Sequence, residues 1–346
     1  MKAARLFGKQ DIRYVEVARP HAGPGEIILR TKAASVCGTD VRFFSNGRPG
    51  VDEGHPITLG HELSGIVDEV DSDAAGYESG MRVAVAPNFG CGLCDFCVSG
   101  QSHLCNMTEA IGVTIDGAFA EFVRIPVAAV RQGNVVEIPE QLSFEEAALA
   151  EPLSCVYNAY ERIGIHPGEV VLIIGSGPIG IMHAKVALMA GAAKVFLNDV
   201  NAARLEQAKS IEPRLEVLQS SGLTEEIARR TDGRMCDLVI TAAGVAAAQQ
   251  MSFGLAGVNG RIMFFGGLPK GESVVELDTN EIHYKQLTVS GTTRQSLRQY
   301  RKCMQLMSDG ILDIGAVITA RRPMSELKNI LRSVGNDDNL KTAVLP

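Results

Sequence analysis

The chain has 346 residues, of which 46% are hydrophobic and 21% are charged. This length is enough for about two domains, and the composition is typical of a globular protein rather than a disordered or fibrous one. The formal net charge of −7 and the lack of a basic stripe argue against nucleic acid as a partner. The N-terminal segment turns polar too early for a signal peptide, and no uncharged run is as long as a membrane span. We therefore expect a cytoplasmic protein that has no membrane partner.

The first part of the chain carries short apolar stretches that are rich in β-branched residues and separated by turn residues. This pattern predicts strands and, together, a β-rich domain of barrel type. The predicted strands cover residues 12–17, 26–34, 65–70 and 82–85. Cys37 follows the second of these strands, and His61 and Glu62 precede the third.

Four cysteines, Cys91, Cys94, Cys97 and Cys105, lie within fifteen residues at the spacing C-x2-C-x2-C-x7-C. Four thiolates in one loop can enclose one ion in a closed tetrahedral shell, which is typical of structural zinc. An iron–sulfur cluster also suits four thiolates, but this spacing departs from the ferredoxin patterns. Four unrelated thiols are a further alternative, which the close spacing disfavours. We predict a structural zinc that fixes the loop from about residue 88 to residue 108.

A helix is predicted over residues 144–152, and a nucleotide-binding pattern follows it. The run Val-Val-Leu-Ile-Ile at residues 170–174 cannot alternate between inside and outside, so it predicts a strand that is covered on both faces in a parallel sheet. The glycine turn G-x-G-x-x-G comes next, and its glycines allow a sharp bend, the approach of a pyrophosphate and close packing of the next helix. The N-terminus of that helix faces the phosphates. The candidate cofactor-binding residues of the turn are Gly175, Gly177, Pro178, Ile179 and Gly180.

A helix over residues 178–191 and a second apolar strand over residues 194–198 lead to Asp199, which lies 19 residues after Gly180. A dinucleotide-binding fold places a carboxylate there to bind the hydroxyls of the adenosine ribose. Because a carboxylate repels a 2′-phosphate, Asp199 favours NAD over NADP, and Arg204 partly offsets this preference. The alternative is an ordinary strand–helix–strand unit with turn glycines and a solvated aspartate.

The rest of the chain completes two domains. Further strands are predicted over residues 237–241, 261–265 and 287–290, a helix over 296–310 and a last strand over 340–345. We predict a catalytic domain at 1–152, a dinucleotide domain at 153–291 and a return to the catalytic domain at 292–346.

A second metal site is indicated by Cys37, His61, Glu62 and Glu151. A thiolate, an imidazole and a carboxylate suit zinc, and a fourth position open to water or substrate would make the site catalytic. Their sequence spacing does not show that they converge, so a buried thiol, a hydrogen-bonded histidine and solvated carboxylates remain alternatives. No second histidine follows His61 four residues on, which excludes the helical metalloprotease motif.

These motifs together resemble the zinc-dependent medium-chain alcohol dehydrogenases, and within them the sorbitol or polyol dehydrogenase branch. The resemblance covers essentially the whole chain. Glu151 resembles the polyol branch most, because the simple alcohol dehydrogenases of the family have a second cysteine there. The resemblance implies a GroES-like barrel, a Rossmann domain with a doubly wound parallel sheet, two zinc ions and NAD per chain, and a homodimer or homotetramer. It is carried by Cys37-Gly38-Thr39-Asp40, Gly60-His61-Glu62, the four-cysteine loop, Glu151-Pro152-Leu153-Ser154, the glycine turn and Asp199.

The resemblance also implies roles for individual residues. Cys37, His61 and one or both of Glu62 and Glu151 would hold a catalytic zinc. This metal would polarise the substrate hydroxyl and favour its alkoxide, which expels a hydride onto the nicotinamide. Thr39 would pass the proton outward through its hydroxyl.

For the substrate, Arg294 resembles the family arginine that hydrogen-bonds the polyol, and Phe43 and Phe119 resemble the aromatic wall of its pocket. Two positions depart from the family. Arg42 stands where a relay histidine is usual, and Phe43 where sorbitol dehydrogenases usually have tyrosine. Arg42 is either a surface ion-pair partner or a cation suited to a phosphorylated or acidic polyol.

We therefore predict a zinc- and NAD-dependent enzyme that oxidises a sugar alcohol to a ketose, or catalyses the reverse. The alternatives among enzymes are a polyol-phosphate 5-dehydrogenase of the galactitol-1-phosphate type and a threonine or butanediol dehydrogenase. A non-enzyme alternative is an NAD-binding regulator or structural protein on the same fold. The presence of every type of zinc ligand weighs against that alternative.

Overall fold

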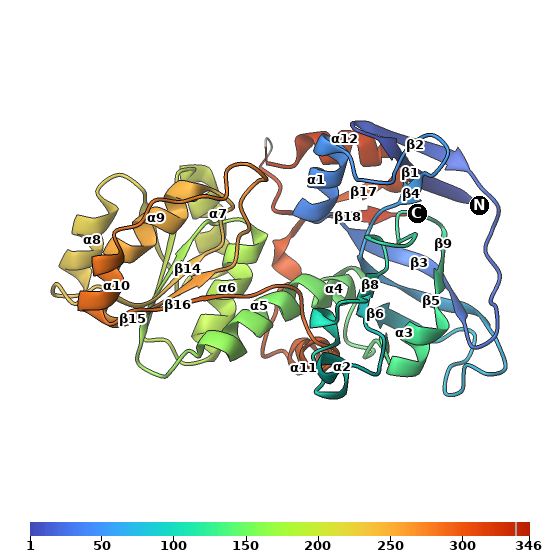
Figure 1. The fold of residues 1–346 in the computed structure, drawn as a ribbon, viewed down its shortest axis with the longest axis horizontal. Coiled ribbons are helices and arrows are strands. Elements are labelled where there is room, and N and C mark those ends of the chain that lie inside the picture. The colour runs from blue at the N-terminus through green and yellow to red at the C-terminus, as the bar shows by residue number, and fades with distance from the viewer. Residues whose placement is uncertain (336–337) are drawn as a thin grey trace. The chain divides into compact units, whose positions relative to one another are not determined.

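The computed structural model describes residues 1–335 and 338–346. Contacts within the chain divide it into two units. Unit 1 comprises residues 1–154 and 294–346, and unit 2 comprises residues 155–293. The sequence analysis places the corresponding boundaries at 152/153 and 291/292. Both ends of the chain lie in unit 1 (Figure 1).

The main sheet of unit 1 has seven strands, in the order β10-β6-β5-β3-β18-β17, with β9 also paired to β3. The strands predicted over residues 12–17, 26–34, 65–70 and 82–85 are confirmed as β2, β3, β5 and β6. The strands of this sheet are β3 (Ile27–Ser35), β5 (Glu62–Val70), β6 (Arg82–Val85), β9 (Phe122–Ile125), β10 (Val135–Glu137), β17 (Ile318–Pro323) and β18 (Lys341–Leu345). A three-stranded sheet joins β2 (Asp11–Glu16), β1 (Lys2–Gly8) and β4 (Ile57–Thr58), and β7 (Asn88–Phe89) pairs with β8 (Glu109–Ala110).

The helices of unit 1 lie between and around these sheets. The predicted helix over residues 144–152 is split at Leu149 into two helices, α4 and α5, and α5 continues into unit 2. Ser143 caps α4, since its hydroxyl accepts a hydrogen bond from the Glu146 N–H over 3.1 Å. The helices are α1 (Gly38–Asn46), α2 (Asp95–Val98), α3 (Val127–Gln132), α4 (Phe144–Ala148), α5 (Ala150–Ile163), α11 (Leu297–Ser308) and α12 (Leu327–Ser333).

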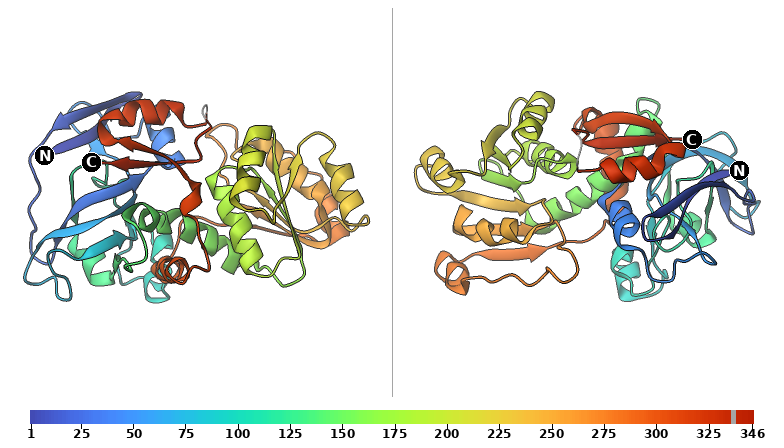
Figure 2. Two further views of the ribbon diagram at one scale, coloured as in Figure 1. Left: turned by 180° about the vertical axis from the view of Figure 1, so that it is seen from behind. Right: turned by 90° about the horizontal axis from the view of Figure 1, so that it is seen from above.

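Unit 2 contains one six-stranded, all-parallel sheet in the order β13-β12-β11-β14-β15-β16. Right-handed crossovers out from β11 in both directions place α6 and α7 on one face and α9 and α10 on the other (Figures 1 and 2). All five residues of β11 are buried, as the branched apolar run predicts. The strands are β11 (Val170–Ile174), β12 (Lys194–Asp199), β13 (Glu216–Gln219), β14 (Cys236–Thr241), β15 (Ala256–Phe264) and β16 (Thr288–Gly291). The helices are α6 (Pro178–Met189), α7 (Ala202–Ile211), α8 (Leu223–Arg230), α9 (Ala246–Leu255) and α10 (Thr279–Lys285).

This sheet confirms the predicted doubly wound fold. Its strand order reverses direction at β11, which is where such sheets bind their ligands, beyond the carboxyl ends of the strands. Among the described residues, no helix combines the length and the apolar character that a membrane span requires.

Candidate active site and metal centres

Cys37 is positioned by the turn between β3 and α1. It is the N-cap residue of α1. Its backbone N–H donates to Oδ2 of Asp40 over 2.9 Å, and this bond fixes the first turn of the helix. The local fold therefore places the Cys37 sulfur at the N-terminus of α1.

His61 lies next to the same aspartate. The Gly60 N–H donates to Oδ1 of Asp40 over 3.3 Å, and Nδ1 of His61 lies 3.6 Å from that oxygen. Burial by itself lowers the pKa of His61, but the charges of Cys37 and Asp40 outweigh it and raise the pKa well above its ordinary value. The surroundings of His61 thus favour a positive charge, which a metal ion can supply in place of a proton.

Close contact between glycines fixes the backbone at His61. Gly60 has a φ of 95°, and its carbonyl accepts a hydrogen bond from the Ala118 N–H over 2.9 Å. A Cβ atom on Gly112 would lie 2.0 Å from the Gly60 oxygen and 2.9 Å from the His61 nitrogen. On Gly117 it would lie 2.3 Å from the same oxygen. Glycine at these positions is what allows the two segments to approach.

Glu62 begins β5 and is fully buried. Its Oε1 accepts a hydrogen bond from the Lys341 ammonium over 2.7 Å, and its Oε2 accepts one from the Ser35 hydroxyl. Lys341 also donates to the Val36 carbonyl over 2.8 Å. Burial lowers the pKa of Lys341, but the charges of Glu62 and Cys37 outweigh it and raise the pKa. A buried ammonium therefore lies in contact with the Glu62 side chain.

Cys37, His61 and Glu62 bring a sulfur, a nitrogen and an oxygen within 4.8 Å of one another. This donor set fits zinc. Glu151 is not part of this three-residue group. It lies in the first turn of α5, is 6% exposed, and its charge contributes to the raised pKa of Lys341. The thiol and imidazole ligands thus converge, with one carboxylate among them and a second in α5.

The other predicted residues of this site lie in two places. Thr39 and Phe43 are on α1 with Cys37, and the Arg42 guanidinium donates to Oγ1 of Thr39 over 3.4 Å. Phe43 is half-buried against the core of unit 1. Phe119 is fully buried, and its ring lies about 3.1 Å from where a Cβ on Gly60 would be. Phe119 therefore packs behind the backbone that leads into His61.

The four-cysteine loop, residues 88–108, is called the zinc lobe below. The four Sγ atoms lie within 4.8 Å of one another, which fits a closed shell around one ion. Cys94 is the N-cap residue of α2, and Cys97 lies within that helix. A Cβ on Gly90 would lie 2.5 Å from the Cys97 sulfur, so only glycine leaves room for this shell.

Backbone N–H groups of the zinc lobe point at its sulfurs. Those of Leu93 and Cys94 donate to Sγ of Cys91 over 3.5 and 3.4 Å, and that of Cys91 donates to Sγ of Cys105 over 3.4 Å. These bonds lower the pKa of Cys91 to about 6 and also lower that of Cys105. Burial raises the pKa of Cys97 to about 12. A cation is therefore needed to hold Cys97 as a thiolate beside Cys91 and Cys105.

Arg294 lies against the zinc lobe. Its Nη1 donates to the carbonyl of His103 over 3.1 Å, and His103 belongs to the short 3₁₀ turn Ser102–Leu104. The side chain of the next residue, Gln295, accepts a hydrogen bond from the Asn88 amide over 3.2 Å. The segment that carries the predicted substrate residue is thus bonded to the zinc lobe at two points.

In unit 2 the glycine turn follows β11. Gly175 has a φ of 112°, and a Cβ on Gly180 would lie 1.8 Å from the Gly175 oxygen. Gly177 is the N-cap residue of α6, whose first turn contains Pro178 and Ile179. A Cβ on Gly177 would meet no atom within 4 Å. Gly180 therefore serves packing, whereas Gly177 leaves open space at the helix N-terminus, where an anion is favoured.

Asp199 is the last residue of β12. Its Oδ2 accepts hydrogen bonds from the N–H and the hydroxyl of Ser176 over 2.7 and 2.8 Å, and its Oδ1 accepts one from the Asn201 N–H over 2.9 Å. Burial raises the pKa of Asp199, but these bonds and the charge of Arg204 outweigh it and lower the pKa. An anionic carboxylate therefore stands beside the glycine turn.

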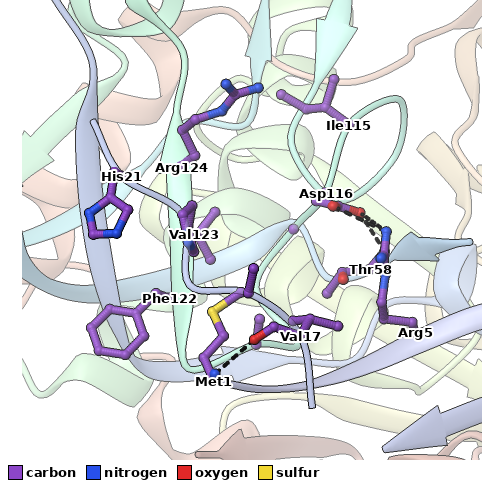
Figure 3. Close-up of a pocket in the computed structure, with 14 residues that line it drawn as sticks. Met1, Arg5, Val17, His21, Thr58, Ile115, Asp116, Phe122, Val123 and Arg124 are labelled. Atoms are coloured by element: carbon purple, nitrogen blue, oxygen red, sulfur yellow. Dashed lines mark hydrogen bonds and ion pairs between the residues drawn. The ribbon is translucent and has the colours of Figure 1, made fainter. Parts of the chain in front are cut away.

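A cavity of about 460 Å³ lies elsewhere in unit 1 (Figure 3). Arg5 and Asp116 face each other across part of it, 3.3 Å apart, and Phe122 and Arg124 also line it. Among the described residues that line it, none is a predicted metal, cofactor or substrate residue. The metal-binding groups therefore define the candidate site, and this cavity does not.

Comparison with known proteins decides the family. Residues 23–140 match the model of the alcohol dehydrogenase GroES-like domain, and residues 178–309 match that of the zinc-binding dehydrogenases. Sorbitol dehydrogenase of Bacillus subtilis is 30% identical over 353 aligned residues, which cover 100% of this chain and 97% of that protein. The chain belongs to the zinc-dependent medium-chain alcohol dehydrogenases.

Two further relatives of this dehydrogenase extend the comparison. L-threonine 3-dehydrogenase of Rhizobium etli strain CIAT 652 is 32% identical over 328 residues, covering 91% of this chain and 89% of that protein. A crystal structure from Sinorhizobium meliloti, described as a zinc-binding dehydrogenase bound to NADP, is 31% identical, with a TM-score of 0.89 and coverage of 100% and 99% of the two chains. The predicted family, fold and activity on CH–OH groups with zinc and a nicotinamide cofactor are confirmed.

Two contributors to the dehydrogenase site were not predicted from the sequence. Lys341 was part of a predicted strand, and Asp40 was only part of a motif. A charged residue at the start of a strand whose other residues are uncharged, Lys341–Leu345, is a signal that a buried partner exists. Nothing in the sequence identifies Glu62 as that partner.

Proposed function

We propose that this dehydrogenase transfers hydride between a sugar alcohol and NAD, interconverting a polyol and a ketose. The observation that carries the proposal is the convergence of Cys37, His61 and the buried carboxylate Glu62. A second buried carboxylate, Glu151 in α5, stands where the simple alcohol dehydrogenases have a second thiol. The similarity to a sorbitol dehydrogenase over the full chain supports it.

In this proposal, Cys37 and His61 hold the catalytic zinc together with Glu62 or Glu151, and the four cysteines of the zinc lobe hold the structural zinc. When bound, the catalytic zinc supplies a Lewis acid that favours ionisation of the substrate hydroxyl. Asp40 orients the His61 ring beside it. Lys341 donates a hydrogen bond to Glu62 and so fixes the position of its side chain beside Cys37 and His61.

The proton of the substrate hydroxyl passes to the hydroxyl of Thr39. Arg42 contacts that hydroxyl but stays charged, because a guanidinium does not lose its proton in proteins. The proton therefore leaves Thr39 through water rather than through a side chain. Arg294 donates hydrogen bonds to the hydroxyls of the sugar alcohol, and Phe43 contacts its carbon chain.

The dinucleotide binds at the glycine turn, with its pyrophosphate at Gly177 and the first turn of α6. Asp199 accepts hydrogen bonds from the adenosine ribose and disfavours a 2′-phosphate because its lowered pKa keeps it charged. We therefore propose NAD rather than NADP as the working cofactor. The proposal also includes a homodimer or homotetramer, tested by light scattering, and the cytoplasm, where reducing conditions keep the lobe thiols able to bind metal.

The second candidate is an L-threonine dehydrogenase, favoured by relatives at 32% identity. The test is NADH formation, followed by absorbance, across hexitols, pentitols, inositols, their phosphates, threonine and butanediol, before and after chelation. We expect chelator-sensitive turnover of a free polyol. Turnover of threonine alone, or a rate lost when the phosphate of a polyol phosphate is removed, would replace the proposal. Silence on the whole panel, in protein that binds zinc and NADH, would favour a regulator.

A further inference from the structure

The backbone at Arg294 adopts a conformation that needs an external cause. Its φ of 55° lies in the left-handed region, which non-glycine residues keep only where the surroundings hold them. One contact of its side chain is the hydrogen bond from Nη1 to the His103 carbonyl, 3.1 Å long. The side chain of the next residue, Gln295, accepts a hydrogen bond from the Asn88 amide, and Ser296 is the N-cap residue of α11. Arg294 is thus oriented by the zinc lobe.

The His103 carbonyl is tied in turn to the thiolate shell. His103 lies two residues before Cys105, and the Cys105 N–H donates to the Ser102 carbonyl over 3.1 Å, which closes the short 3₁₀ turn around it. The Sγ of Cys105 accepts from the Cys91 N–H on the far side of the shell. The position of the carbonyl therefore follows the position of Cys105.

The entrance to the lobe is held by residues outside it. The Asn134 amide donates to the Asn88 carbonyl over 2.8 Å, and the Gln132 amide donates to the Gly90 carbonyl over 2.7 Å. Between Gly90 and Cys105 the lobe has backbone hydrogen bonds of its own, such as the one from the Leu104 N–H to the Gln101 carbonyl over 2.9 Å, and its four sulfurs lie within 4.8 Å of one another. A metal held by the four sulfurs would tie Cys105, and with it the turn that contacts Arg294, to the rest of the lobe.

We propose that the zinc lobe is the positioning element for Arg294. Closure of the four thiolates around zinc fixes the His103 carbonyl, which orients the Arg294 guanidinium toward the hydroxyls of the sugar alcohol. The substrate half of this inference rests on the proposed function, in which Arg294 binds the polyol. The structural zinc then sets the affinity for substrate as well as stability, and by reciprocity Arg294 tightens the hold on that zinc.

The first test measures zinc alone. In a Cys37→Ser background, which lacks a ligand of the other metal, release of zinc to a chromogenic chelator is followed for Arg294→Ala and for the control Arg321→Ala. Arg321 forms an ion pair with Glu145 over 2.9 Å, and neither residue belongs to the lobe. We expect release about tenfold faster with Arg294→Ala and unchanged with Arg321→Ala. Equal release from both would overturn the proposal, whether or not a substrate is known.

The second test is a double-mutant cycle on the KM for the sugar alcohol, at a temperature where every variant is folded. Cys94→Ser and Arg294→Ala should each raise KM about tenfold with kcat within about twofold, and the double variant should match Arg294→Ala alone. If the two increases in KM multiply in the double variant, Arg294 and the zinc lobe act independently and the proposal is overturned. Faster zinc release with an unchanged KM in Arg294→Ala would overturn the substrate role of Arg294. If Cys94→Ser does not fold, the zinc-release result decides.

Discussion

At the scale of single residues, the ion pair between Lys341 and Glu62 is the most consequential, because the two side chains are only 5% and 0% exposed. Removing one partner leaves the other charge buried without compensation. We expect Lys341→Met to lower the free energy of unfolding by about 3 kcal/mol. The measurement is a urea titration of zinc-free protein, in which no other cation replaces the ammonium. Lys341→Arg, which keeps the charge, should lose less than half as much; equal stability of Lys341→Met and wild type would contradict the assignment.

His183 makes stability depend on pH. Its ring packs edge-on against Phe265 with centroids 4.6 Å apart, and burial lowers its pKa from 6.5 to about 3. Because the folded pKa lies below the unfolded one, this contribution to stability is full above pH 6.5 and is lost as the pH falls toward 3. Between pH 7 and 5 the wild type should lose about 2 kcal/mol more than His183→Leu. The measurement is a urea titration of both proteins at the two pH values. An equal loss of unfolding free energy in the wild type and in His183→Leu would contradict this prediction.

In the proposed function, Asp199 sets the preference for NAD over NADP. Replacing it by alanine would then remove the carboxylate that repels a 2′-phosphate and binds the ribose. We expect the ratio of kcat/KM for NAD to that for NADP to fall at least about tenfold in Asp199→Ala, which is about 1.4 kcal/mol of discrimination. Asn201→Ala, which alters the cap of α7 beside it, is the control. An unchanged ratio would remove Asp199 from the cofactor site.

At the scale of elements, the glycine turn provides a matched pair of variants. A Cβ on Gly180 would collide with the Gly175 oxygen, whereas one on Gly177 meets open space. Gly180→Ala should therefore destabilise unit 2, while Gly177→Ala should unfold like the wild type yet bind NADH at least about tenfold more weakly, since the backbone must approach the pyrophosphate. Thermal unfolding and NADH fluorescence titration separate the two effects. Wild-type NADH affinity in Gly177→Ala would place the pyrophosphate elsewhere.

Elements with a strong local pattern were predictable. β11 and β12 are apolar runs bounded by turn signals, and α6 begins at the glycine turn with Pro178 in its first turn. β17 was not predicted, because its sequence Ile-Thr-Ala-Arg-Arg-Pro lacks alternation and it depends on pairing with β18. α12 was missed as well, although three of its seven residues are buried in unit 1.

At the scale of the whole molecule, the sequence could nominate site residues by chemical type but not by position. Cys37, His61 and Glu62 are residues of types that bind zinc, but their convergence is visible only in the structure. Lys341 lies 279 residues after Glu62, and Arg294 lies 191 residues after His103. Hydrogen bonds over such separations are set by how strands and loops are arranged, which no local pattern records.

The most direct test of the account follows NADH formation from the sugar alcohol in Cys37→Ser, beside wild type and Cys94→Ser, with zinc counted in each. We predict that Cys37→Ser folds, keeps one zinc per chain and loses at least about a thousandfold in kcat, about 4 kcal/mol of activation free energy. Cys94→Ser should lose stability and keep kcat within about twofold of the wild type, with the raised KM described above. A Cys37→Ser protein with two zinc ions and wild-type turnover would contradict the account.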